Sequence, residues 1–175
     1  MKRTIITITA AVLLSVAGCN RTPAVPSHDE LLKSIDSIEK PLMEAAQFEN
    51  VDTLKGRQLV DLYVQFADAY PDDSLTASYL HKAASVCNGM GLIDEMVTYY
   101  DRVIDNYPDY ELLDECYYSK GIALDNAGRK EEARKAYEDF LEVFHDHFLA
   151  DDIRKALPLL DLSDEMLIKY LNSNS

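Results

Sequence analysis

The chain has 175 residues, enough for one folded domain with a buried core, and 47% of them are hydrophobic. This hydrophobic content excludes a disordered tail, and six Gly and six Pro exclude a collagen-like rod. The net charge of −14 disfavours nucleic acid and anionic lipid headgroups as partners, whereas a basic partner is compatible with it.

The first 18 residues have the order of a secretory signal peptide. Lys2 and Arg3 precede an apolar or small run, Ile5–Ala17, which is shorter than the about 20 apolar residues of a membrane-spanning helix. The run closes on Val16-Ala17-Gly18-Cys19, which resembles the lipobox of bacterial lipoproteins. This resemblance implies a lipoprotein signal peptide over residues 1–18 and a lipid anchor at Cys19. An ordinary signal peptide with a Cys nearby is the alternative.

Residues 19–26 comprise the Cys and a predicted linker, Asn20–Pro26, which has two prolines and no periodicity. Asn20 stands where an Asp would resemble an inner-membrane retention signal, so the outer membrane is favoured. Some lipoproteins of the Bacteroides group carry an acidic run after the Cys when they are displayed outside. The linker has none, which favours the periplasmic face. Loss of residues 1–18 would leave 15 basic against 31 acidic residues, a net charge of −16.

The first predicted helix begins at Ser27, which can cap it, with Glu30 completing a capping box. Because Pro suits the first turn of a helix rather than its interior, we expect a second helix from Pro41 to about Asn50. This helix is predicted to pair with Leu54–Tyr70 as the first hairpin, which leaves the helix from Ser27 as an amino-terminal cap.

Two more predicted hairpins follow. The central one starts with the helix Leu75–Asn88 and turns at Gly89 and Gly91, and the last one spans Asp114–His147. A carboxyl-terminal cap is expected beyond it, made of Ala150–Leu160, interrupted at Pro158, and a short helix from Ser163.

The hairpins repeat with a constant period of 37 residues. Residues 27–175 are therefore predicted to form an all-α solenoid of about three stacked helical hairpins with capping helices at both ends. The equivalent residues are Phe66, Val103 and Phe140; Tyr63, Tyr100 and Tyr137; Gly91 and Gly128; and Pro71, Pro108 and His145.

The last hairpin resembles the unit of the tetratricopeptide repeat family, whose usual length is about 34 residues. Lys120 departs from the pattern, because an apolar residue is usual there, and His145 replaces the closing Pro. The matching residues are Tyr117, Gly121, Leu124, Ala133 and Tyr137. With the lipobox, the resemblance is to a bacterial lipoprotein of the cell envelope, of a Bacteroidetes-like kind.

Repeats of this family bind segments of partner proteins on the concave face lined by their first helices. Tyr117, Gly121 and Leu124 are predicted to face the second helix. Because each step along a helix turns the side chain by about 100°, the residues that follow them are expected to point toward the concave face. A merely solvated face is the alternative. The predicted groove residues are His81, Ser85 and Asn88 on the central hairpin, and Tyr118, Ile122, Asp125 and Asn126 on the last. The strip lacks the set of Lys, Arg and Asn residues with which relatives bind a chain-terminal carboxylate. The expected ligand is therefore an internal or basic segment of a partner rather than an acidic C-terminus.

The resulting hypothesis is a lipid-anchored adaptor without cofactor or catalytic residues, resembling those of outer-membrane assembly, division or secretion complexes. The alternative is a small envelope enzyme or metal-dependent protein that uses His145 and His147 with acidic pairs such as Asp72-Asp73 and Asp151-Asp152. These acids fall at predicted helix starts, which favours a structural role. A self-associating spacer is the third possibility.

Cys87 and three tyrosines are predicted to belong to the core, and no disulfide is expected between Cys87 and Cys116. Cys87 lies near the end of its predicted helix and Cys116 near the beginning of the equivalent one, so their sulfurs are expected about 10 Å or more apart, as two separate thiols. The tyrosines that recur at the period of 37 residues are predicted to pack inside the hairpins rather than to bind a ligand.

Overall fold

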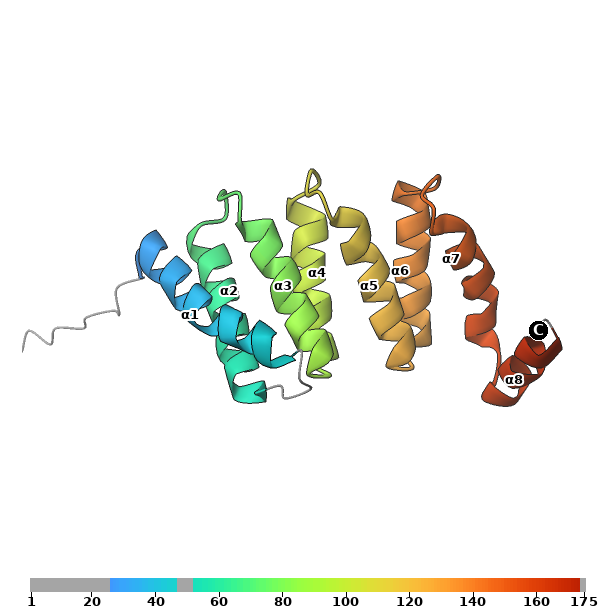
Figure 1. Ribbon diagram of the computed structural model, residues 1–175. Helices are drawn as coiled ribbons and strands as arrows, with labels where there is room; N and C mark the ends of the chain where they lie inside the picture. Colours follow the sequence, from blue (N-terminus) through green and yellow to red (C-terminus); the bar gives the residue numbers. More distant parts are fainter. Residues whose placement is uncertain (1–25, 47–51, 174–175) are drawn as a thin grey trace, which may run out of the picture.

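The computed structural model describes residues 26–46 and 52–173, which form a row of α-helices joined by short turns (Figure 1). The predicted signal peptide, Cys19 and the linker up to residue 25 lie outside the described residues. No helix in the described part is both long enough and apolar enough to span a membrane. In chain order the elements are α1 (His28–Ala46), α2 (Thr53–Ala69), α3 (Thr76–Gly89), α4 (Ile93–Asn106), α5 (Leu113–Asn126), α6 (Lys130–Val143), α7 (Ala150–Ala156), the 3-10 helix η1 (Leu157–Asp161) and α8 (Asp164–Ser173).

Consecutive helices pack as antiparallel hairpins, α1 with α2, α3 with α4, and α5 with α6, which confirms the predicted all-α solenoid. The tyrosines at the 37-residue period are buried in these seams: Tyr63 is 0%, Tyr100 2% and Tyr137 2% exposed. Their burial confirms the prediction of a packing role, since burying a large apolar side chain contributes about 1.5–3 kcal/mol.

Pro41 does not begin a helix, which corrects the sequence-based prediction at the amino-terminal end. It lies inside α1, and the described residues hold one helix before α2 rather than a cap followed by a second helix. The buried side chains of Leu31, Ile35 and Leu42 form one stripe that continues past the proline. Burying Leu42 contributes about 1.5–3 kcal/mol, comparable to the about 3 kcal/mol that an interior proline costs. Pro41 has no N–H for the carbonyl group of Ser37, and because Ser37 is exposed, this carbonyl group can be hydrated. Helix α1 is therefore the first helix of the first hairpin.

The start of α1 agrees with the predicted cap in part. The Glu30 carboxylate accepts hydrogen bonds from the backbone N–H of Ser27 at 2.8 Å and from its hydroxyl at 2.8 Å. These contacts supply the Glu half of a capping box, whereas the Ser27 hydroxyl donates to Glu30 instead of accepting from the helix backbone.

Gly91 and Gly128 close the first helix of their hairpins in the same way. Both have positive φ angles, 72° and 73°. The residue after each glycine donates its N–H five positions back, Leu92 to Cys87 O and Arg129 to Leu124 O, each at 2.9 Å. This is the hydrogen-bond pattern of a Schellman motif, whose left-handed residue glycine adopts without strain.

The turn that follows the second helix of each hairpin contacts the first helix of the same hairpin through one residue that recurs every 37 positions. Asp73 Oδ2 lies 3.0 Å from His28 Nε2, Tyr110 Oη lies 3.2 Å from His81 Nδ1, and His147 Nε2 lies 3.1 Å from the Oδ2 atom of Asp114. The turn residue keeps its place in the period, whereas its chemical nature and the position of its partner change. These contacts fix the turns over α1, α3 and α5.

The seam of the last hairpin contains a very close approach. An alanine Cβ at Gly121 would lie 2.6 Å from Cε1 and 2.7 Å from Cδ1 of the Tyr137 ring. Leu124 is buried beside it, and the half-buried Tyr117 ring stands edge-on to Phe144 at 5.7 Å. Gly121 is thus required because the ring of Tyr137 occupies the space of a side chain.

Cys87 on α3 and Cys116 on α5 are separate thiols, as predicted, and both are buried, which the sequence predicted only for Cys87. Burial raises the pKa of Cys87 to about 11 and that of Cys116 to about 12. Both groups are therefore protonated at neutral pH and act as small apolar side chains.

The carboxyl-terminal elements follow the prediction closely. Helix α7 ends where η1 begins at Leu157, and Pro158 occupies the first turn of η1. Arg134 of α6 donates to Asp161 Oδ1 at 2.5 Å and so joins η1 to the last hairpin. Helix α8 lies at the end of the row in Figure 1, with Met166 and Ile168 exposed.

Candidate partner-binding surface

The predicted strip on the first helices lies on α3 and α5, and four of its seven side chains are exposed. Ser85 and Asn88 are exposed on α3, and Ile122 and Asn126 on α5. Ile122 is 37% exposed, so an aliphatic side chain stands among groups that can donate and accept hydrogen bonds. Such a combination suits a peptide whose backbone is bonded by the polar groups and whose apolar side chain packs on Ile122.

His81 differs from the prediction because it is buried, with 7% of its surface exposed. Its ring packs edge-on against Tyr110 at 5.9 Å and lies 5.8 Å from Tyr100, and its Nε2 atom is 3.8 Å from Glu115. Burial lowers the pKa of His81, while the Glu115 carboxylate opposes this shift. His81 therefore supports the turn after α4 and is not an open side chain of the strip.

Tyr118 and Asp125 are half-buried, so each serves the fold as well as the surface. The Tyr118 ring stands edge-on to Phe140 at 6.4 Å and packs against the core of the last hairpin. Asp125 accepts from Lys130 Nζ at 3.2 Å. Truncation of Tyr118 would remove core packing, so Ile122 and Asn126 are the better positions for testing binding.

Lys120, which stands where the family resemblance predicts an apolar residue, is paired inside the molecule. Its Nζ atom lies 2.5 Å from Asp101 Oδ1 of α4, and its side chain is only 17% exposed. The aliphatic stem takes the place of the apolar side chain, while the ammonium group is neutralised by Asp101 of the preceding hairpin.

The two histidines of the predicted alternative site do not converge. His145 Nε2 lies 3.0 Å from Asp146, whereas His147 Nε2 lies 3.1 Å from Asp114 on α5. Over residues 26–46 and 52–173 no group of three His, Cys, Asp or Glu side chains could hold a metal ion. The turn thus lacks the third ligand that a stable site requires.

The acidic pairs of the same hypothesis lie at helix starts, as their structural interpretation predicted. Asp73 Oδ1 accepts from the backbone N–H of Leu75 at 2.8 Å, just before α3. Asp151 and Asp152 lie in the first turn of α7 and pair with Arg154 and Lys155. The helix dipole and local cations explain these acids without a catalytic role.

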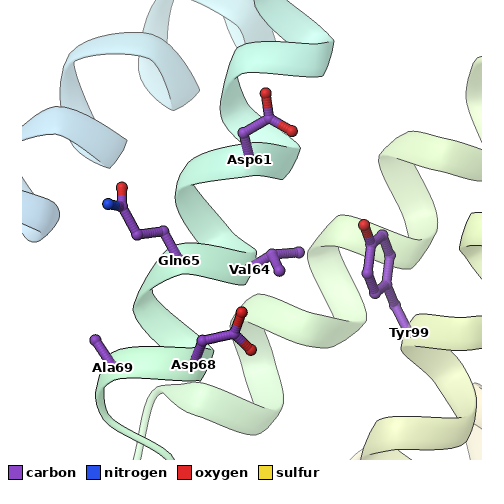
Figure 2. A pocket seen from close by; sticks show the side chains of 6 residues that line it. All are labelled: Asp61, Val64, Gln65, Asp68, Ala69 and Tyr99. Atoms are coloured by element: carbon purple, nitrogen blue, oxygen red, sulfur yellow. The ribbon is translucent and has the colours of Figure 1, made fainter. Parts of the chain in front are cut away.

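A second surface feature, not predicted from the sequence, is a hollow between the second helices α2 and α4 (Figure 2). Its volume of about 530 Å³ lies within the about 300–1,000 Å³ of ligand pockets, although it is open to solvent. Val64 points from α2 toward Tyr99 of α4, with Asp61 and Asp68 on either side along α2 (Figure 2). The remaining lining residues are Gln65 and Ala69.

Comparison with known families matches both of the later hairpins. One model of the tetratricopeptide repeat matches residues 78–110, and another matches residues 114–144. These two segments are tetratricopeptide repeats. They cover most of α3 with α4, and of α5 with α6. No curated protein matches the chain.

Tetratricopeptide repeats generally bind protein partners and typically act as scaffolds rather than enzymes, which is the class of function that the two matches support. The first hairpin, α1 with α2, lies outside the matched segments but packs on α3 in the same row. Its long first helix with an interior Pro41 departs from the tetratricopeptide pattern.

Proposed function

We propose that the protein is a lipid-anchored tetratricopeptide scaffold of the bacterial cell envelope that binds segments of partner proteins through α3 and α5. The observation that carries this proposal is the strip of Ser85, Asn88, Ile122 and Asn126, which is exposed on the first helices of two matched repeats. These are the helices with which repeats of this family bind their partners.

The anchor is proposed from the sequence. The charged start, the short apolar run and Val16-Ala17-Gly18-Cys19 support lipidation at Cys19. The several acyl chains of such an anchor hold a protein on a bilayer, whereas a single chain binds only marginally. Asn20 and the linker without acids support the periplasmic face of the outer membrane, where a scaffold could serve assembly, division or secretion complexes.

The anchor is tested by Cys19→Ser. This variant is expected to lose fatty-acid labelling and to move from the membrane to the soluble fraction. Continued membrane fractionation of the variant, with an unlabelled parent protein, would contradict lipidation.

The binding strip is tested by the double variant Ile122→Ala with Asn126→Ala. Both side chains are exposed, so thermal unfolding should stay unchanged, while capture of crosslinked partners from native membranes should fall about tenfold or more if the strip contains an energetic centre of the interface. Val143→Ala is the matched control, because Val143 is an exposed aliphatic residue of the second helix α6. Equal partner capture by the double variant and the control would place the binding surface elsewhere.

The competing metal-dependent function has its own test. Metal analysis of the purified protein before and after changing His145 and His147 to Ala would reveal a stoichiometric metal ion that depends on them. The separate directions of the two rings argue against this outcome.

A further inference from the structure

Helix α8 stands in the place of a second helix but does not pack as one. By the 37-residue period, α7 and η1 correspond to the first helices α3 and α5, and residues 167–173 correspond to the start of α6. Tyr137, which fills the seam of the last hairpin, corresponds to Asn174, so the sequence offers no tyrosine for a further seam. Within the described ranges α8 has no extensive contact with another helix, and it lies at the far end of the row in Figure 1.

Both sides of α8 carry exposed apolar side chains. Met166 is 55% and Ile168 60% exposed, and residues two positions apart point to nearly opposite sides of a helix. A hollow of about 350 Å³ lies on the Met166 side and is lined by Leu162, Met166, Lys169 and Ser173. An isolated helix of ten residues is only marginally stable in water, because most helical stability in proteins comes from packing of an apolar face. Helix α8 therefore has apolar surface that a partner could cover.

The charges on the Met166 side indicate which partner fits. Glu165 and Lys169 are exposed one helical turn apart, and no hydrogen bond or ion pair joins these two described residues. If two α8 helices pack antiparallel with a two-fold axis near residue 167, Glu165 of each copy lies opposite Lys169 of the other, and the two Met166 side chains meet between these pairs. A parallel arrangement would place like charges together. The charge order along α8 therefore favours a second copy of the same helix, in the antiparallel direction.

We propose that two copies of this chain associate through an antiparallel pair of α8 helices. Because α8 lies at the end of the row, the two copies meet end to end, and the rest of the two acidic chains stays well beyond the about 8 Å over which salt screens their repulsion. A ten-residue helix is about 15 Å long, so the contact is smaller than a standard interface and association is weak and reversible. This surface is separate from the strip on α3 and α5.

Cysteine crosslinking of the full-length protein in intact cells tests the geometry. Met166→Cys should give a disulfide-linked dimer on mild oxidation, because the two side chains meet near the axis. Ile168→Cys is the matched control, since it is equally exposed on the other side of α8 and should give at least about fivefold less dimer. The parent protein measures any background from the native cysteines, of which Cys87 and Cys116 are buried.

Charge exchange tests the identity of the partner. In sedimentation of the purified protein at rising concentration, Lys169→Glu should weaken self-association about tenfold, because two exposed ion pairs are lost at once. Adding Glu165→Lys to this variant should restore association, since the opposed charges are only exchanged. Lys33→Glu, which makes the same change of charge at an exposed position of α1, should leave association nearly unchanged.

Several results would overturn the proposal. Equal disulfide yields from positions 166 and 168, or disulfides from position 166 to a different protein only, would exclude the pairing of two α8 helices. A monomeric protein whose thiol at position 166 is shielded by lipid vesicles from a water-soluble maleimide would identify a membrane as the occupant instead. Association that is unaffected by Lys169→Glu, or that the double exchange fails to restore, would exclude the antiparallel ion pairs.

Discussion

Replacing Gly121 by alanine should loosen the last hairpin, because the new Cβ would lie 2.6 Å from the ring of Tyr137. That ring is 2% exposed and enclosed by the seam, so it cannot move aside without opening a gap. Overpacking of this kind costs about 1–3 kcal/mol, whereas alanine gains about 1 kcal/mol over glycine within a helix. Because the ring is held rigidly, the cost of overpacking should lie in the upper part of its range. After the gain from alanine is subtracted, the net loss of unfolding free energy should be about 1–2 kcal/mol.

Urea unfolding followed by circular dichroism measures this loss, and the thermal midpoint should fall by about 2–8 °C for a chain of this size. Gly89→Ala is the matched control, because Gly89 ends the equivalent helix α3 and a Cβ there meets nothing within 4 Å. It should leave stability unchanged or slightly higher. In the background of Tyr137→Leu, the cost of Gly121→Ala should largely disappear, since the opposing ring is gone. A Gly121→Ala protein as stable as its parent would refute this account of the seam.

Three further predictions concern buried polar groups. Cys87 and Cys116 should resist alkylation at pH 8 in the folded protein and react quickly in urea, because burial raises their pKa values to about 11 and about 12; rapid modification of either residue under native conditions, detected by peptide mass spectrometry, would contradict their burial. Burial lowers the pKa of His81, so as the pH falls His81 is protonated in the unfolded chain, near the ordinary histidine pKa of about 6.5, before it is protonated in the folded protein. Stability should therefore fall below about pH 6.5 and level off below the folded pKa. His81→Gln should lose this part of the pH dependence, and an unchanged dependence in urea titrations would exclude it. Lys120→Met should cost no more than about 1 kcal/mol, because the Asp101 carboxylate is 43% exposed and stays hydrated without its partner; a loss of several kcal/mol in urea unfolding would contradict this.

The period of the sequence was sufficient to predict the core. Tyr63, Tyr100 and Tyr137 recur every 37 residues and are all buried, because stacked hairpins place equivalent residues in equivalent seams. Local sequence rules were insufficient at Pro41. The prediction used the cost of an interior proline and could not include the burial of Leu42, which depends on where α2 lies.

The candidate surface shows the same limit. Helical periodicity predicts the direction of a side chain, and Ser85, Ile122 and Asn126 are exposed on the expected helices. It does not predict what covers that side chain, and Tyr110, from the turn after α4, covers His81. The hollow between α2 and α4 depends on helices far apart in sequence.

The central claim, that partners bind the strip on the first helices, is tested most directly by photo-crosslinking in living cells. A photoreactive amino acid is placed at Ile122 of α5 or, for comparison, at the exposed Glu138 of α6. We predict discrete crosslinked partner bands from position 122 and none of these bands from position 138. The same bands from both positions, or bands from position 138 alone, would contradict the assignment of the binding surface.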